Sequence, residues 1–102
     1  MKISEILTDR SKWTKGAYAR DDCGDPVTIY DSSAVRFCLS GAATKTRVLG
    51  KFYKWFCKQR LKLGLTKNLG KSWEIIVVWN DDKRRTFPQV RRLVRAFERS
   101  LR

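Results

Sequence analysis

Apolar residues recur at helical spacing from the start of the chain. In "ISEILTD", Ile3, Ile6 and Leu7 fall on one side of a helix, because side chains three and four positions apart share a face. This stretch predicts a first, short amphipathic helix. The stretch that follows, "RSKWTKGAYARDDCGDPVTIYD", is interrupted repeatedly by glycine, proline and aspartate. We expect a loop there, with "VTIY" as a short extended piece.

Small and apolar side chains return in "DSSAVRFCLSGAATK", after Asp and Ser residues that suit a helix N-cap. This stretch predicts a helix from about Ala34 to Thr44. Gly41, Ala42 and Ala43 would let another element approach the backbone of this helix closely. We therefore expect the helix to lie inside the fold.

"RVLGKFYKWFCKQRLKLGL" predicts an amphipathic helix with a basic face. At about 100° per residue, apolar side chains occupy one arc and lysines occupy another that is about 80° wide. The apolar arc consists of Val48, Leu49, Phe52, Trp55 and Phe56. The basic arc consists of Lys51, Lys54, Lys58 and Lys62. Gly64, in "GLTKNLGKS", is expected to end the helix.

"SWEIIVVWNDD" is compatible with two structures. Its consecutive β-branched residues between two tryptophans favour a buried strand, whereas Ser72 and Glu74 suit the start of a short helix. We favour a helix because the chain offers no convincing partner strand, and an isolated strand leaves its backbone groups unpaired. One short extended segment at 73–79 is the alternative.

The last stretch, "RRTFPQVRRLVRAFERSLR", predicts a helix with two opposed faces. Thr86 and Gln89 fit a capping box and Pro88 suits a first turn, so the helix should begin at about Phe87. The apolar face consists of Val90, Leu93, Val94, Phe97 and Leu101. The basic face consists of Arg91, Arg92, Arg95, Arg99 and Arg102. We expect the first face to dock on the core and the second to point outward.

These patterns predict a mainly α fold, a small single-domain structure of four to five helices. The length of 102 residues fits one domain. Hydrophobic residues make up 42% of the chain, which is too many for a disordered protein despite the charge.

The positive charge is concentrated in one part of the chain. The formal net charge is +13, yet residues 1–33 are near-neutral, with five Lys or Arg against six Asp or Glu. Residues 34–102 are strongly basic, with eighteen against four. Such an excess attracts polyanions: nucleic acid first, then acidic protein surfaces or anionic lipid.

The cysteine and histidine content argues against an enzyme. The sequence has no histidine, which excludes His-based catalytic triads and HExxH metal sites. Cys23, Cys38 and Cys57 form no C-x-x-C pair and are odd in number, as expected of reduced thiols in a cytosol. Cys38 and Cys57 lie on predicted apolar helix faces, where cysteine is usually a small core residue. We expect no catalytic residue, no metal and no cofactor.

Two other kinds of residue have a competing functional interpretation. The aspartates could bind Mg²⁺, but beside glycine and proline they more often cap helices and form turns: Asp21, Asp22, Asp25, Asp31, Asp81 and Asp82. Trp55, Trp73 and Trp79 are expected in the core. Only Trp13 and Tyr53 are candidates for stacking on bases.

Three motifs in order resemble an uncharacterised family of small phage and bacterial proteins, a domain of unknown function. They are W-x-x-G-A at Trp13, A-V-R-F-C-x-x-G-A at Ala34, and W-N-D at Trp79, followed by R-T and a valine. The resemblance implies a largely helical fold and brings no reaction with it. Its pattern falls on Trp13, Gly16, Ala17, Arg36, Cys38, Gly41, Ala42, Trp79, Asn80, Asp81, Arg85, Thr86 and Val90. The lysine arc lies outside this pattern.

The basic faces are the strongest functional signal in the sequence. They predict a non-enzymatic protein that contacts phosphates of DNA or RNA, since Arg donates paired hydrogen bonds and Lys adds point charges. The predicted contact residues are Lys51, Lys54, Lys58, Lys62, Arg84, Arg85, Arg91, Arg92, Arg95 and Arg99. The alternative is a phage-type adaptor or inhibitor that binds an acidic surface of a host protein, using exposed aromatics such as Trp13 and Tyr18.

The location follows from what the sequence does not contain. No stretch resembles a signal peptide or approaches the length of a membrane span. We expect a cytoplasmic protein without a membrane partner, in the host cytoplasm if a phage encodes it.

Overall fold

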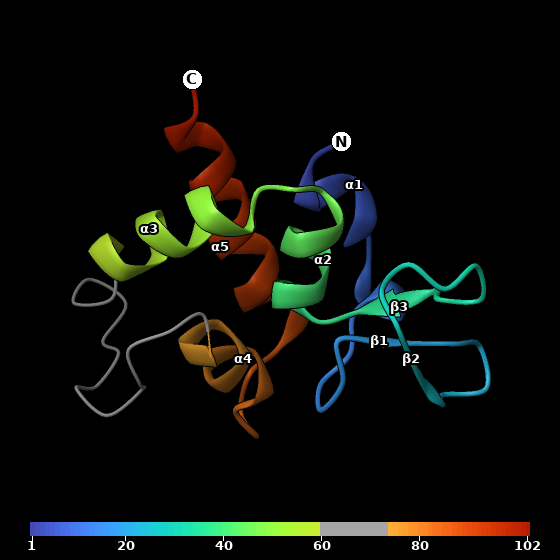
Figure 1. Cartoon of the computed structure of the whole chain (residues 1–102). Coiled ribbons are helices and arrows are strands. Elements are labelled where there is room, and N and C mark those ends of the chain that lie inside the picture. The colour runs from blue at the N-terminus through green and yellow to red at the C-terminus, as the bar shows by residue number, and fades with distance from the viewer. Residues whose placement is uncertain (60–73) are drawn as a thin grey trace.

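Five α-helices and a small sheet make up the part of the chain that the computed structural model describes, residues 1–59 and 74–102 (Figure 1). The helices are α1 (Ile3–Ile6), α2 (Leu39–Lys45), α3 (Leu49–Gln59), α4 (Glu74–Asp81) and α5 (Phe87–Ser100). A short 3-10 helix, η1 (Arg10–Lys12), follows α1. The strands are β1 (Ala19–Arg20), β2 (Pro26–Val27) and β3 (Arg36–Phe37). The prediction of a mostly helical domain is confirmed, but the sheet was not expected.

The sheet is antiparallel, in the order β2-β1-β3. Ala19 at its centre pairs with Val27 on one side and Phe37 on the other. Pro26 lies in an edge strand, where its missing N–H breaks no inner ladder. The stretch expected to be a loop is therefore partly a hairpin. Its "VTIY" piece is extended only at its first residue, Val27.

The helix expected from Ala34 begins only at Leu39, so that boundary prediction was wrong. The backbone of the preceding residues is committed to β1 instead. Val35 N–H donates to Arg20 O at 2.9 Å, and Cys38 N–H donates to Tyr18 O at 3.1 Å. The helix starts where this pairing stops, and Cys38 Sγ caps it by accepting from Gly41 N–H at 3.2 Å.

The prediction that this helix lies inside the fold is confirmed. α2 packs against α1, α3 and α4, and Leu39, Ala42 and Ala43 are fully buried. A Cβ at Gly41 would come within 2.2 Å of Tyr18 O, so only glycine allows the sheet to approach this closely. The small residues thus set the distance between helix and sheet.

α3 and α4 are both helical, as favoured from the sequence. Arg47, with φ 63°, turns the chain between α2 and α3. Residues 74–79, for which a short extended segment was the alternative, belong to α4, so that alternative is wrong there. The helix buries Ile75, Ile76 and Trp79 on one side and leaves Val78 exposed. Trp73, Lys62 and the expected helix end at Gly64 lie outside the described residues.

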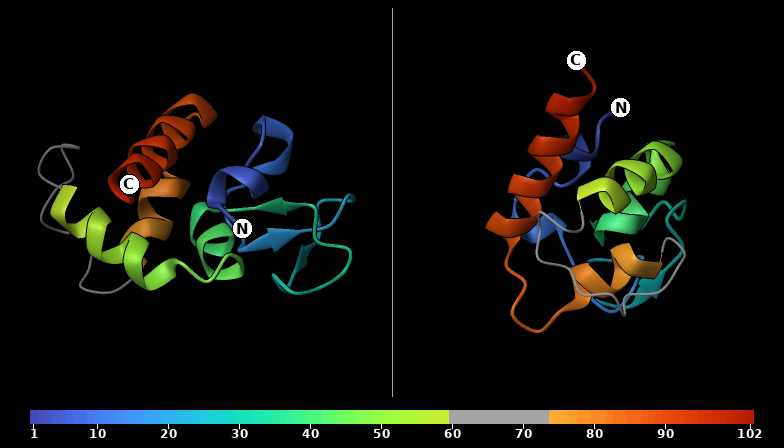
Figure 2. Two further views of the ribbon diagram at one scale, coloured as in Figure 1. Left: turned by 90° about the horizontal axis from the view of Figure 1, so that it is seen from above. Right: turned by 90° about the vertical axis from the view of Figure 1, so that its left-hand side faces the viewer.

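α5 begins at Phe87 behind the predicted capping box, with Thr86 N–H donating to Gln89 Oε1 at 3.0 Å. Its apolar face docks on α1 and α3, and the three helices lie together in both views of Figure 2. Leu101 was expected on this face but is 55% exposed, because it follows the last helical residue. That part of the prediction was wrong.

Candidate nucleic-acid interface

The arginine face of α5 points into solvent. Val90, Leu93, Val94 and Phe97 are buried beneath it, whereas Arg91, Arg92, Arg95 and Arg99 are exposed. Within residues 1–59 and 74–102, none of these four guanidinium groups has a hydrogen-bond or ion-pair partner. Their charge is therefore available to a ligand. Arg102 is also exposed.

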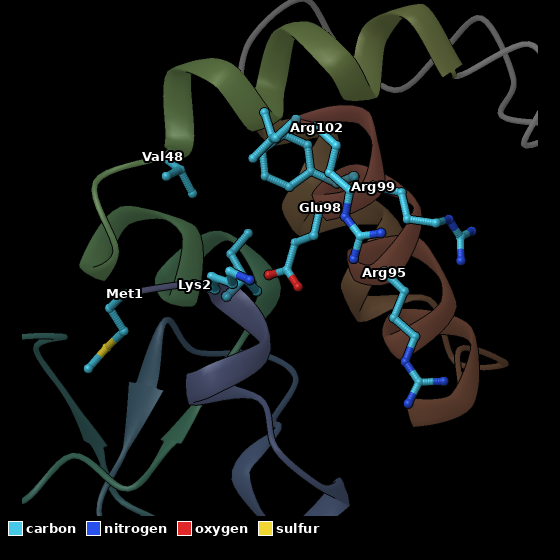
Figure 3. Close-up of a pocket in the computed structure, with 10 residues that line it drawn as sticks. Met1, Lys2, Val48, Arg95, Glu98, Arg99 and Arg102 are labelled. Atoms are coloured by element: carbon cyan, nitrogen blue, oxygen red, sulfur yellow. The ribbon is translucent and has the colours of Figure 1, made fainter.

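Glu98 is the one acid of α5, and it is engaged elsewhere. Its Oε2 accepts from Ser4 N–H of α1 at 3.1 Å. Figure 3 shows Glu98 pointing toward Lys2 across a hollow of about 500 Å³, while Arg95 and Arg99 point away from α1. The acid thus joins two helices and does not neutralise the arginine face.

The lysine arc of α3 is exposed as well, as far as the described residues go. Lys51, Lys54 and Lys58 lie on the surface, and Phe52 and Phe56 are buried below them. Lys62, the fourth predicted member, lies outside the described residues.

The two basic faces belong to one packed pair of helices. Phe52 of α3 meets Phe97 of α5 edge-on, with ring centroids 4.9 Å apart, and Trp55 lies 5.5 Å from the same ring. The aromatic contact fixes α3 against α5. The two helices that carry the basic faces are therefore neighbours in the fold (Figure 1).

A groove of about 440 Å³, here called the interhelical groove, separates the two faces. Residues of α3, α4, α5 and the segment before α5 line it: Trp55, Gln59, Trp79, Arg85, Gln89, Arg92, Leu93 and Ala96. The sequence reasoning missed Gln59, Gln89 and Ala96 as site residues. Their only sequence signal is position: Gln89 and Ala96 fall between the apolar and basic arcs of α5, whereas Gln59 falls within the apolar arc of α3, between Trp55 and Phe52.

Arg84 and Arg85, both predicted contacts, have different roles in the structure. Arg84 is exposed and remains a candidate. The Arg85 guanidinium lies 3.8 Å from the centroid of the Trp79 ring, and its Nε–H donates to Trp79 O at 2.8 Å. Burial lowers the pKa of Arg85. We therefore assign Arg85 to the fold and remove it from the predicted contacts.

The motif residues form a polar network around Asn80, which is fully buried. Its Oδ1 accepts from Trp13 Nε1–H at 2.7 Å and from Leu39 N–H at 3.1 Å. Its Nδ2 donates to Thr14 O at 3.1 Å and to Asp81 Oδ1 at 2.9 Å. All four hydrogen-bonding positions of the amide are thus used. The network ties the N-terminal segment, α2 and α4 together.

Other motif contacts also serve the fold. Gly16 N–H donates to Asp81 Oδ1 at 3.1 Å, and Gly16 has a φ of 79° that favours glycine. Trp13, a candidate for base stacking, packs against the core, and its ring centroid lies 6.1 Å from that of Phe87. Tyr18 is half exposed and remains available to a partner. Tyr53 is partly buried.

The cysteines and aspartates have structural surroundings. Burial raises the pKa of Cys38 to about 11, which leaves its thiol protonated at neutral pH. Asp21 Oδ1 accepts from Cys23 N–H and Asp25 N–H at the tip of the β1–β2 hairpin. Asp82 Oδ1 accepts from Arg84 N–H. These are the contacts of turn-forming aspartates, as the sequence favoured.

Comparison with protein-family models shows the family to which the chain belongs. The model of DUF6197, a family of unknown function, matches residues 2–99. The chain belongs to this family. No curated protein and no solved structure matches the sequence. None of the helices that the structure describes is long and apolar enough to cross a lipid bilayer.

Proposed function

We propose that this DUF6197 protein is a non-enzymatic, basic binding protein that contacts nucleic-acid phosphates through α5 and α3. The observation that carries the proposal is the arginine face of α5, whose guanidinium groups have no partner in the described part of the chain. Exposed guanidinium groups without acidic partners are costly to collect on one face, because like charges repel. A phosphate backbone relieves that repulsion and accepts the paired hydrogen bonds that arginine donates.

The proposed contact residues are exposed in the structure and come from both basic faces and the segment before α5. They are Lys51, Lys54, Lys58, Arg84, Arg91, Arg92, Arg95 and Arg99. If six of them neutralise phosphates of a duplex, log K should fall with log salt at a slope of about −5. A single strand should give about −4 for the same number of contacts.

The test measures fluorescence anisotropy of a labelled random-sequence duplex and a labelled single strand across salt, starting at about 50 mM. A variant with Arg91→Gln, Arg95→Gln and Arg99→Gln should bind at least about tenfold more weakly, and its salt slope on a duplex should be shallower by about 2.7. The matched control is Lys2→Gln, Arg10→Gln, Lys12→Gln. It removes the same charge from exposed positions outside both faces.

The result separates a defined face from total charge. An equal loss in the two triple variants would mean that only net charge matters. Absence of binding to either nucleic acid at low salt would refute the function itself. Circular dichroism of each variant checks that the fold is unchanged.

A second candidate function is an adaptor that binds an acidic protein surface. It is favoured by the half-exposed Tyr18, which lines an apolar groove of about 740 Å³ beside Val27 and Ile29. Exposed aromatics beside apolar surface are typical of protein interfaces. A pulldown from nuclease-treated lysate discriminates the two. A retained protein partner that Tyr18→Ser releases would favour the adaptor.

A further inference from the structure

The interhelical groove is lined partly by apolar and aromatic side chains, which phosphate binding does not require. Its lining includes the apolar side chains of Leu93 and Ala96 from α5 and the Trp55 ring from α3. The volume of about 440 Å³ lies in the range typical of small-ligand sites. Phosphates could be bound by the exposed cations alone, without such a hollow.

Two amide side chains in the groove have unused hydrogen-bonding groups. Gln89 Oε1 accepts from Thr86 N–H at 3.0 Å and from Arg85 Nη1 at 3.5 Å. Among the described residues, the Nε2 protons of Gln89 have no acceptor. The side-chain amide of Gln59 makes no hydrogen bond within the described residues. Gln59 can therefore both donate and accept, and Gln89 can donate, which matches the mixed edges of nucleobases.

Cations flank the groove on both sides. Arg92 lines it on the α5 side. On α3, Lys51 and Lys58 fall about 40–60° from Trp55 around the helix axis, at about 100° per residue. An apolar, aromatic hollow with free amides is thus bordered by positive charge, as in binding sites for single strands.

We propose that the interhelical groove accepts one unstacked base of a single-stranded nucleic acid, while Arg92 and the α3 lysines bind the flanking phosphates. This inference rests on the proposed function and narrows its ligand. A base in a duplex is paired and stacked, so it cannot enter the groove without leaving the helix. A duplex would then use the basic faces alone, and a single strand would use the faces and the groove.

The test fills the groove without changing any charge. Ala96→Leu places an aliphatic side chain in the groove and adds no ring on which a base could stack. Leucine is also a good helix former, so α5 should be preserved. The matched control is Gly50→Leu on α3, outside the groove lining, where an added Cβ meets nothing within 4 Å.

Affinity is measured by anisotropy with an oligothymidylate of about 20 nucleotides, an oligouridylate of the same length and a duplex, at one salt concentration. The wild-type protein should prefer the single strands. Ala96→Leu should weaken their binding about tenfold and leave duplex binding unchanged, because one base contact is lost. Gly50→Leu should match the wild-type protein on all three ligands. The two single strands differ in the sugar and in the C5-methyl group of the base, so a third strand, oligodeoxyuridylate, shows whether a preference comes from the sugar.

A second variant keeps the inference testable if Ala96→Leu does not fold. Gln59→Ala removes an unbonded amide and should weaken single-strand binding alone. An unchanged ratio of single-strand to duplex affinity in both groove variants would overturn the inference while the proposed function stands. Equal wild-type affinity for single strand and duplex would overturn it as well. If none of the ligands binds, the proposed function fails first.

Discussion

Replacing Asn80 with alanine tests whether the motif network holds the fold together. The side chain is fully buried and uses all four hydrogen-bonding positions. Asn80→Ala leaves Leu39 N–H and Trp13 Nε1–H without their acceptor. A buried donor without a partner costs about 1–3 kcal/mol.

The two donors do not contribute equally. Leu39 is fully buried, so leaving its N–H without an acceptor should cost close to the upper end of this range of about 1–3 kcal/mol. Trp13 is only partly buried, and water can replace some of its hydrogen bond. With a small cavity added, we expect the free energy of unfolding to fall by about 3 kcal/mol. This is a large part of the roughly 5–15 kcal/mol available to a domain, and it lowers Tm by about 15 °C.

Urea unfolding followed by far-UV circular dichroism measures this loss by linear extrapolation. Gln59→Ala is the control, since it also truncates an amide but removes no hydrogen bond among the described residues. It should change the stability by less than about 0.5 kcal/mol. A loss below about 1 kcal/mol in Asn80→Ala would show that the network is not important for stability.

Asn80→Asp separates hydrogen bonding from size. The aspartate keeps an acceptor for Trp13 and Leu39 but turns its second oxygen toward Thr14 O and the Asp81 carboxylate. Burying a charge beside two acceptors should destabilise the fold at neutral pH at least as much as alanine does. Wild-type stability of this variant would contradict the assigned hydrogen bonds.

Two further predictions follow from buried and exposed positions of the same residue type. Gly41→Ala should destabilise the fold by several kcal/mol, because its Cβ would overlap Tyr18 O, whereas Gly50→Ala in open space should stabilise it by about 0.5–1 kcal/mol in the same urea assay. Equal effects would refute the close approach of α2 to the sheet. Iodoacetamide at pH 8 should label exposed Cys23 quickly and Cys38 only after unfolding, because burial raises the pKa of Cys38 to about 11. Mass spectrometry of the native protein measures both rates, and comparable rates would be inconsistent with a buried Cys38.

The long helices could be predicted because their signal is local. In α5, the capping box and the spacing of Val90, Leu93, Val94 and Phe97 all lie within one segment of sequence. The sheet could not be predicted in the same way. Each strand has two residues, too few for alternation to show, and β1 pairs not only with β2 in a hairpin but also with β3, which lies further along the chain. The start of α2 was misplaced for the same reason, since β1 determines where that helix can begin.

The candidate site was only half predictable. Exposure of the arginines follows from the angular pattern of one helix, which the sequence contains. The interhelical groove depends on how α3, α4 and α5 cross, and the contact between Phe52 and Phe97 fixes this crossing. Arg85 shows a second limit, because its charge in the sequence predicts a ligand contact, whereas only the structure shows its guanidinium stacked on the Trp79 ring. Charge alone does not distinguish a solvated arginine from one stacked on a ring.

The motif residues and the basic faces therefore have different roles: the first stabilise the fold, and the second are exposed on its surface. Motif residues such as Asn80, Gly41 and Arg85 make contacts that hold the fold together. The exposed arginines of α5 make no such contacts within the described residues, so charge can be added to or removed from that face at little cost to stability. A protein with the same motif and a neutral α5 face could thus share this fold without sharing the ligand. If nucleic-acid binding follows the arginines, it belongs to this chain's surface and is not implied by membership of the family.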